Sequence, residues 1–247
     1  MSHRKLFISD LHLSPSRTDL TQLFEKFIDQ HTQNASELYI LGDLFDAWIG
    51  DDNLSVFNKK IATLIRSLSE RNIDVYFMPG NRDFLLGENY CSLCHMHLLP
   101  DPFMIDIDGN KILLTHGDLF CTHDTNYQNY RAKIQNPKMK KRILKLPLFI
   151  RQLLARIMRK KSQHESNQIS QDNMKKFDVN LTDLVNYCNK HQVKTVIHGH
   201  THLPGIDLIN QLTTKDYQYR FVLSDWHKTG HYLEMKTGCP PTLHHFS

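Results

Sequence analysis

Five short polar segments of the sequence carry side chains of the kinds that bind metal ions. Their carboxylate, imidazole and amide groups together suit borderline divalent metals such as Mn²⁺, Fe²⁺ or Zn²⁺ rather than the all-oxygen cage that Ca²⁺ prefers. They therefore predict a transition-metal site. In chain order the segments are Asp10-Leu-His12, Gly42-Asp43-Leu-Phe-Asp46, Gly80-Asn81-Arg82-Asp83, His116-Gly117-Asp118 and His198-Gly-His200-Thr-His202.

The number of candidate ligands indicates two ions rather than one. A spacing of two residues, as in Asp10-x-His12 and His200-x-His202, places both side chains on the same side of an extended segment. Glycines beside the polar residues allow the backbone to come close to an ion or a phosphate. Seven ligands are too many for one ion but suit two ions roughly 3.5–4 Å apart that share one carboxylate. The seven are Asp10, His12, Asp43, Asn81, His116, His200 and His202.

Each polar segment follows a run that is typical of a short buried strand. These apolar runs lie at 6–8, 38–41, 75–78, 112–114 and 196–197. Apolar residues at helical spacing occur between them, at 20–28, 57–68 and 181–190. The tail from 217 to 235 is predicted to form two further strands around 228–230. The alternation indicates a layered α/β fold with helices outside the sheet.

In such folds ligands bind at the carboxyl ends of the strands, so the five polar segments are expected to meet in one crevice. A single Asp-x-His or His-Gly-Asp segment is usually a helix cap or a polar residue of the core. Five such segments in order, each after a predicted strand, are not expected by chance. This convergence is the strongest indication of an active site in the sequence.

The stretch from about 121 to 177 interrupts the alternation and is predicted to be a helical insertion over the core of one domain spanning 1–247. Between 131 and 161 there are twelve Lys or Arg and no Asp or Glu, although the whole chain has 30 basic and 26 acidic residues. One basic patch on an acidic body argues against a nucleic-acid binder. Apolar residues of the insertion repeat at helical spacing. They are Ile150, Leu153, Leu154, Ile157 and Met158.

A basic stretch is often only a solvated face, but the apolar stripe beside it favours shallow contact with an anionic membrane surface. The N-terminus lacks the apolar region of a secretory signal, and no apolar run approaches the ~20 residues that span a bilayer. Five cysteines without framework spacing indicate reduced thiols. We interpret Cys91-x-x-Cys94 as two ordinary thiols rather than a zinc or redox site. A cytoplasmic protein is expected.

The ordered motifs D-x-H, G-D-x-x-D, G-N-x-[DEH], H-G and G-H-x-H resemble those of the calcineurin-like metallophosphoesterase superfamily over most of the chain. The resemblance implies a four-layer αββα sandwich and two divalent ions, expected to be Mn²⁺. It implies that Asp43 bridges the ions. The remaining ligands it implies are Asp10, His12 and His202 for one ion, and Asn81, His116 and His200 for the other.

One position departs from the common superfamily pattern. Many members have His after the Gly-Asn pair, where it can protonate an alkoxide leaving group, whereas Arg82 stands there in this sequence. A phosphate monoester, with a second pKa near ~6, leaves without a proton and needs only charge stabilisation. Arg82 supplies that with a planar, permanently charged group. The sequence therefore favours cleavage of a pyrophosphate, with Asp43, Asn81, Arg82, His116 and His200 as the catalytic residues.

A closer resemblance, over nearly the whole chain, is to the UDP-2,3-diacylglucosamine pyrophosphatase family of lipid A biosynthesis. It rests on FISDLHL at 7–13, LGDLFDAWIGDD at 41–52, PGNRDFL at 79–85, THGDLFCTHDTNYQNYRAK at 115–133, IHGHTHLP at 197–204 and WH at 226–227. The resemblance implies hydrolysis of this nucleotide-linked glycolipid to UMP and 2,3-diacylglucosamine 1-phosphate (lipid X). It also implies that the insertion is a lid that receives the acyl chains.

In that family the matching positions imply substrate contacts from Asn81, Arg82, Asp124, Ser162, Asn167 and His200. Two departures concern these contacts. The family run S-K-x-x-N-S-S-K is replaced by SQHESNQIS at 162–170, with an insertion and no clear matching Lys, and His123 stands where an Asp is usual.

Two alternatives remain open at this point. One is another dinuclear-metal nucleotide pyrophosphatase or phosphodiesterase of the same superfamily, which a panel of substrates would distinguish. The other is a non-catalytic scaffold on the same fold, a class that loses metal ligands, whereas none of the expected ligands is missing here. We expect no nucleic-acid partner, no obligate protein partner, and peripheral attachment to the cytoplasmic face of the inner membrane.

Overall fold

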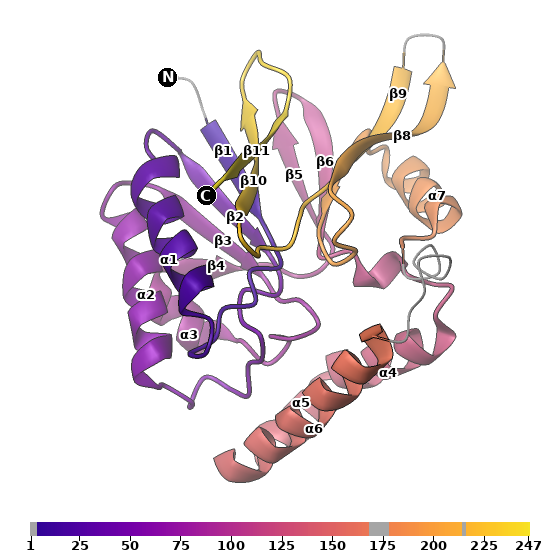
Figure 1. Ribbon diagram of the computed structural model, residues 1–247. Helices are drawn as coiled ribbons and strands as arrows, with labels where there is room; N and C mark the ends of the chain where they lie inside the picture. The colour runs from indigo at the N-terminus through magenta and orange to yellow at the C-terminus, as the bar shows by residue number, and fades with distance from the viewer. Residues whose placement is uncertain (1–3, 168–177, 214–215) are drawn as a thin grey trace.

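The computed structural model describes the backbone of residues 4–167, 178–213 and 216–247, and their side chains except at 160–167, 211–213 and 216. Its centre consists of two β-sheets (Figure 1). The first sheet has the strand order β11-β10-β1-β2-β3-β4: Thr242–Phe246, Gly230–Lys236, Arg4–Ile8, Glu37–Leu41, Asp74–Met78 and Met96–Leu98. The second has the order β5-β6-β7-β9-β8: Phe103–Ile107, Asn110–Thr115, Thr195–His198, Asp216–Val222 and Gly205–Thr213.

Side chains of the central strands alternate between two apolar layers. In β1, Leu6 and Ile8 pack with the outer helices, while Phe7 packs between the two sheets. In β6, Leu114 joins Phe7 in the layer between the sheets, and Leu113 packs on the opposite side. Successive residues of a strand point to opposite faces, and here both faces are buried. That is why these strands read as continuous apolar runs.

Helices cover the outer face of each sheet (Figure 1). On the first sheet lie α1 (Thr18–Lys26), which continues as a π-helix at Phe27–His31, α2 (Val56–Ser69) and α3 (Glu88–Cys94). On the second lies α7 (Leu181–His191), whose Leu184 and Cys188 pack against Leu113 and Val196. The order helix, sheet, sheet, helix confirms the predicted four-layer αββα sandwich.

Three further helices follow β6 in the chain: α4 (Thr125–Gln135), α5 (Pro137–Leu144) and α6 (Leu148–Asn167). They lie beside the sandwich, below it in Figure 1. Asn136 caps α5, with its side chain accepting the Lys138 N–H, and Pro137 occupies the first turn, so the sequence itself separates α4 from α5. Among the described helices none combines the length and the apolar character that crossing a membrane requires.

The sequence patterns missed β4, β5, β8, β11 and α3. Both predicted tail strands exist as β9 and β10, but they belong to different sheets: β9 pairs parallel with β7, and β10 pairs antiparallel with β1. Neighbouring strands in a sequence need not pair, because pairing depends on contacts across the whole chain. Cys91 and Cys94 lie on the buried face of α3 and pack in the core, as ordinary apolar side chains would.

Candidate metal centre

The predicted ligands lie in the loops that follow β1, β2, β3, β6 and β7. Backbone hydrogen bonds join these loops to one another: the Asp10 N–H donates to Gly42 O at 3.1 Å, and the His12 N–H donates to Asp43 O at 3.0 Å. A third bond, from Gly199 N–H to His116 O at 3.0 Å, joins the loops after β6 and β7. The carboxyl ends of these strands therefore meet, as the α/β architecture predicts.

Two groups of side chains are arranged so that an ion could contact each. The ligand atoms of Asp10, His12 and His202 lie within 4.8 Å of one another, and so do those of Asp10, Asp43 and His116. Thus five of the seven predicted ligands fall into these two groups.

Asn81 and His200 complete the set. The Asn81 Oδ1 atom lies 3.0 Å from His116 Nε2 and 3.1 Å from His200 Nδ1. The structure therefore brings all seven predicted ligand side chains together in one place.

The backbone at the centre adopts a costly conformation. Left-handed φ angles at residues other than glycine cost about 1–3 kcal/mol each and gather at functional sites. Close approach adds a second constraint, because a Cβ at Gly199 would lie 2.2 Å from Asp10 Oδ2 and one at Gly80 would lie 2.3 Å from Asp43 Oδ1. The candidate ligands with such angles are Asp10 (56°), His12 (49°), Asp43 (54°), His200 (68°) and His202 (55°).

Several polar atoms of the centre lack the partners that burial normally demands. Asp10 Oδ1 and both ring nitrogens of His12 are buried and accept or donate no hydrogen bond within the described residues. His116 donates its Nδ1–H to Leu41 O at 2.9 Å, so in the neutral ring the lone pair that can bind a cation is on Nε2, the nitrogen that faces Asn81. These atoms, of the types that Mn²⁺ or Zn²⁺ prefers, fit divalent cations.

The electrostatics also favour added positive charge. Burial alone would lower the pKa of His116, but the carboxylates of Asp43 and Asp10 raise it to about 9. Burial likewise opposes the charge on His202, but the carboxylates of Asp10 and Asp225, 3.4 Å and 3.3 Å from its ring nitrogens, raise its pKa to about 10. The buried carboxylates therefore stabilise cations next to them, whether these are protons on imidazole or metal ions.

Asp43 is better placed than Asp10 to serve two ions. Its Oδ2 lies 3.9 Å from His12 Nδ1, in the first group, and its Oδ1 lies 3.8 Å from His116 Nε2, beside Asn81. Asp10 is also close to both groups, but its Oδ2 already accepts the Ser9 hydroxyl at 2.6 Å and the His200 N–H at 2.9 Å. One oxygen of Asp10 thus accepts two hydrogen bonds, whereas each oxygen of Asp43 faces a different imidazole and, among the described contacts, only Oδ1 accepts a hydrogen bond, from the Arg82 N–H.

Arg82 lies beside Asp43 and is only partly buried. Its Nε is 3.5 Å from Asp43 Oδ2, and its side chain keeps 22% of its surface exposed. Its main-chain N–H separately donates to Asp43 Oδ1 at 2.9 Å. The side chain is thus free to meet a ligand, while the main chain holds the carboxylate in position.

Two carboxylates to which we assigned no role support the predicted ligands. Asp83 is fully buried and accepts N–H groups from Gly80 at 2.7 Å, and from Asp43 and Phe45 at 3.3 Å, so it joins two ligand loops. Asp225 Oδ2 lies 3.3 Å from His202 Nδ1 and orients that ring. Asp83 could have been found from its place in the Gly-Asn segment. No pattern in the sequence marks Asp225.

The structure places one of the three predicted substrate residues of the insertion. Asp124 caps α4, with its Oδ1 accepting the Tyr127 N–H at 2.8 Å. The side chains of Ser162 and Asn167 lie outside the described residues.

The basic stretch is not wholly a solvated face. Arg151 is 4% exposed and donates to Ile49 O at 2.5 Å and to the Asp52 carboxylate, and Arg159 forms an ion pair with Asp46. These contacts dock α6 onto the loop that follows β2.

Residues 3–204 match the calcineurin-like phosphoesterase family. The UDP-2,3-diacylglucosamine hydrolase of Stenotrophomonas maltophilia is 42% identical over 240 residues, which is 94% of this chain and 95% of the relative. The protein of the same name from Shigella dysenteriae is 39% identical over 239 residues, 97% of this chain and 98% of the relative. A solved archaeal phosphodiesterase aligns over 98% of this chain and 99% of its own, at a TM-score of 0.49 and 13% identity.

Proposed function

We propose, from the premise that the chain belongs to the calcineurin-like phosphoesterase family, that it hydrolyses the pyrophosphate bond of UDP-2,3-diacylglucosamine. The products are UMP and 2,3-diacylglucosamine 1-phosphate (lipid X), a step of lipid A biosynthesis. The substrate is assigned from a relative that is named for this glycolipid. This chain is 42% identical to that relative and covers 95% of the relative's length. The type of reaction, metal-dependent hydrolysis, is inferred from the metal centre.

We assign two divalent ions, Mn²⁺ in the first instance, to the centre. One would be held by Asp10, His12 and His202, the other by Asn81, His116 and His200, and Asp43 would be shared by both. When bound, such a pair of ions activates water and neutralises phosphoryl oxygens. The assignment is supported by the unpartnered atoms of Asp10 and His12, and by the position of each Asp43 oxygen.

The remaining work falls to side chains of the protein. Arg82 neutralises charge on the departing phosphate, which needs no proton because it leaves as a stable anion. Asn81 orients a phosphoryl oxygen from its position between His116 and His200. Asp83 keeps the loops after β2 and β3 in register, so that Asp43 and Asn81 face the same phosphorus. Rigid positioning of this kind supplies much of an enzyme's rate enhancement.

The substrate assignment predicts the products and a ranking of substrates. With Mn²⁺ in ¹⁸O-labelled water, UDP-2,3-diacylglucosamine is expected to give UMP and lipid X, and mass spectrometry should find the label in UMP, because attack on the phosphorus nearer uridine expels the sugar phosphate. NADH, ADP-ribose and cyclic AMP are expected to react far more slowly. Faster hydrolysis of any of the three would contradict the glycolipid assignment and favour the rival nucleotide pyrophosphatase or phosphodiesterase.

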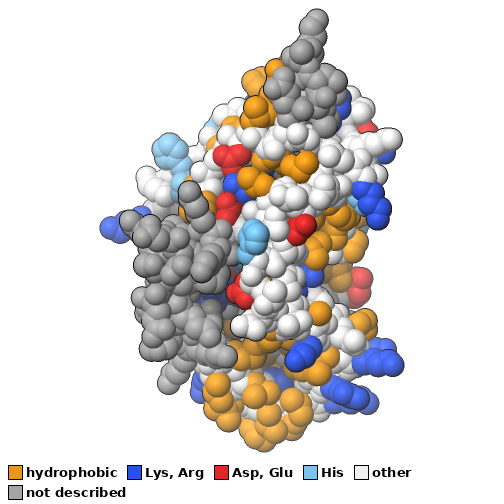
Figure 2. Space-filling view, turned by 90° about the vertical axis from the view of Figure 1, so that its right-hand side faces the viewer, with side chains coloured by type: hydrophobic (Ala, Val, Ile, Leu, Met, Phe, Trp, Pro, Cys, Tyr) orange, Lys and Arg blue, Asp and Glu red, His pale blue; other side chains and the backbone are white. Residues whose placement is uncertain are grey.

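We further propose that the insertion contacts acyl chains and an anionic membrane surface, which would place the protein at the cytoplasmic face of the inner membrane. Exposed apolar and basic side chains gather over α5 and α6, at the bottom of Figure 2. Phe149 is 70% exposed, and Leu153 and Ile157 are each 56% exposed. Apolar side chains flanked by Lys and Arg are typical of helices that lie in the membrane interface.

Flotation with vesicles tests the membrane contact. Anionic vesicles are expected to bind more protein than neutral ones, and the difference should shrink as salt is raised, because ions screen the attraction. Phe149→Ser should weaken binding, whereas Val56→Ser should not, since Val56 is 88% exposed but lies on α2, outside the insertion. Equal binding to both vesicle types, or equal effects of the two substitutions, would refute the membrane contact.

A further inference from the structure

Two buried carboxylates near the metal centre share one cation that comes from the insertion. Arg131 of α4 donates from Nη2 to Asp101 Oδ2 at 2.8 Å, and its Nε lies 2.9 Å from Asp118 Oδ2. The exposed fractions of the three side chains are 12%, 8% and 2%, respectively. One guanidinium therefore compensates two carboxylates in a place that water barely reaches.

Asp101 connects the Arg131 guanidinium to the loop that contains His116. Its Oδ1 accepts the Thr115 hydroxyl at 2.7 Å and the His116 N–H at 3.3 Å. His116 is the ligand whose Nε2 lies 3.0 Å from Asn81 Oδ1. The position of the His116 backbone therefore depends on a carboxylate that Arg131 holds in place.

Asp118 connects the Arg131 guanidinium to His200 through Tyr127. Its Oδ2 accepts the Tyr127 hydroxyl at 2.7 Å, and the Tyr127 ring lies 5.9 Å from the His200 ring, tilted by 32°. Gln128 of the same helix donates to the Asp118 carbonyl at 2.7 Å. Helix α4 thus contacts the surroundings of both histidines that we assign to the second ion.

We propose that Arg131 is a positioning residue that couples the docking of α4 to the binding of the second metal ion. The inference rests on the two-ion centre of the proposed function. Without the guanidinium, two buried carboxylates would repel each other and lack a counter-charge. They would move apart, and that movement shifts the Thr115–His116 backbone and releases Tyr127 from its place against His200. Substitution of a residue that contacts a metal ligand commonly changes the metal affinity by about 10–100-fold.

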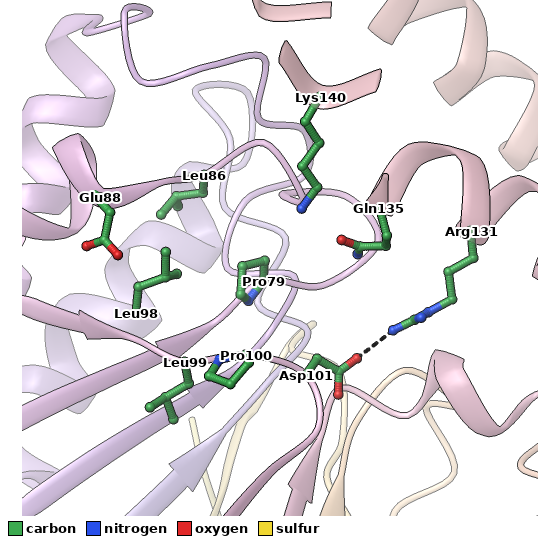
Figure 3. Close-up of a pocket in the computed structure, with 10 residues that line it drawn as sticks. All are labelled: Pro79, Leu86, Glu88, Leu98, Leu99, Pro100, Asp101, Arg131, Gln135 and Lys140. Carbon is green, nitrogen blue, oxygen red and sulfur yellow. Dashed lines mark hydrogen bonds and ion pairs between the residues drawn. The ribbon is translucent and has the colours of Figure 1, made fainter. Parts of the chain in front are cut away.

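The same region offers a matched control. A pocket of about 430 Å³ lies between α4 and α5 on one side and the ends of β3 and β4 on the other, and Figure 3 shows Arg131 reaching Asp101 at its edge. Lys140 of α5 points into this pocket (Figure 3) and is only partly exposed. Among the described contacts it forms no ion pair with Asp101 or Asp118. Lys140→Met removes a cation from the same pocket and leaves the Arg131 contacts intact.

Calorimetric titration of the chelator-treated full-length protein with Mn²⁺ tests the coupling. Arg131→Met is expected to weaken the second binding event by about tenfold or more and to lower kcat more than it raises KM. Arg131→Lys keeps the charge without the two-sided contact and should fall between Met and the unsubstituted protein. Lys140→Met should bind both ions normally. Tyr127→Phe, which retains the ring and loses the bond to Asp118, should weaken the second event by a smaller factor.

The outcomes separate positioning from general stability. If Arg131→Met lowers Tm but binds both ions with unchanged affinity, Arg131 is only structural and the inference is wrong. It is equally wrong if Lys140→Met weakens the second ion as much as Arg131→Met does. Should Arg131→Met fail to fold, Tyr127→Phe and Arg131→Lys decide, because normal second-ion binding in both overturns the coupling. A missing second event in the unsubstituted protein would instead refute the two-ion centre.

Discussion

Replacing Asp43 by Asn is expected to lower kcat by about a thousandfold or more, while the protein remains folded. Asn has nearly the same shape, so the loop after β2 keeps its packing. The change removes a negative charge that faces both His12 and His116, and an amide cannot bind two cations through two anionic oxygens. Burial also raises the pKa of Asp43, so neutralising it relieves a desolvation penalty. We therefore expect the activity to fall without a loss of Tm in the metal-free protein.

The measurement pairs steady-state kinetics with metal content after purification. Bound metal should fall below that of the unsubstituted protein, because both ions lose a shared ligand. Asp46→Asn is the matched control, since Asp46 belongs to the same Gly-Asp-x-x-Asp segment but pairs with Arg159 of α6. It should retain far more activity. Normal turnover in Asp43→Asn would show that this carboxylate does not bridge the ions.

The second large effect is expected for Arg82→Ala, which should lower kcat by about 10²–10³-fold with little change in metal content. The guanidinium is partly exposed and close to Asp43, where it can meet an oxygen of the departing phosphate. The contact from Arg82 to Asp43 Oδ1 is made by the main chain and survives the substitution. Arg82→Ala therefore removes the group that stabilises the transition state and keeps the main-chain bond that positions the metal ligand Asp43.

Arg82→Lys is the informative companion. Lysine restores the charge but not the planar pair of donors, so a partial recovery of kcat is expected. If Arg82→Ala instead raised KM and left kcat unchanged, the side chain would bind substrate and transition state equally. Its role would then be recognition of the substrate rather than stabilisation of the leaving phosphate. Loss of bound metal in Arg82→Ala would likewise contradict the assignment.

The local order of residues was sufficient to predict the candidate ligands and a layered α/β fold, whereas the four-layer arrangement was implied only by the family resemblance. Asp10, His12 and the others were selected because each polar segment follows an apolar run, and that pattern depends only on neighbouring residues. The alternation of Leu6, Phe7 and Ile8 between two apolar layers follows from the same local rule, since a strand buried on both faces has no polar positions. Even the preference for an anhydride came from one position, Arg82, read against the superfamily pattern.

Contacts between distant parts of the chain decided the rest. Asp225 reaches His202, and Asp101 and Asp118 share Arg131, across separations that no local pattern encodes. The assignment of β9 and β10 to different sheets has the same origin, because strand pairing is selected by burial of the whole core. The sequence around a carboxylate does not predict which distant residues will contact it in the fold. The free-energy cost of burying its charge depends almost entirely on those contacts. The sequence by itself therefore determined which groups could bind metal, and the tertiary structure alone decided which charges hold them in place.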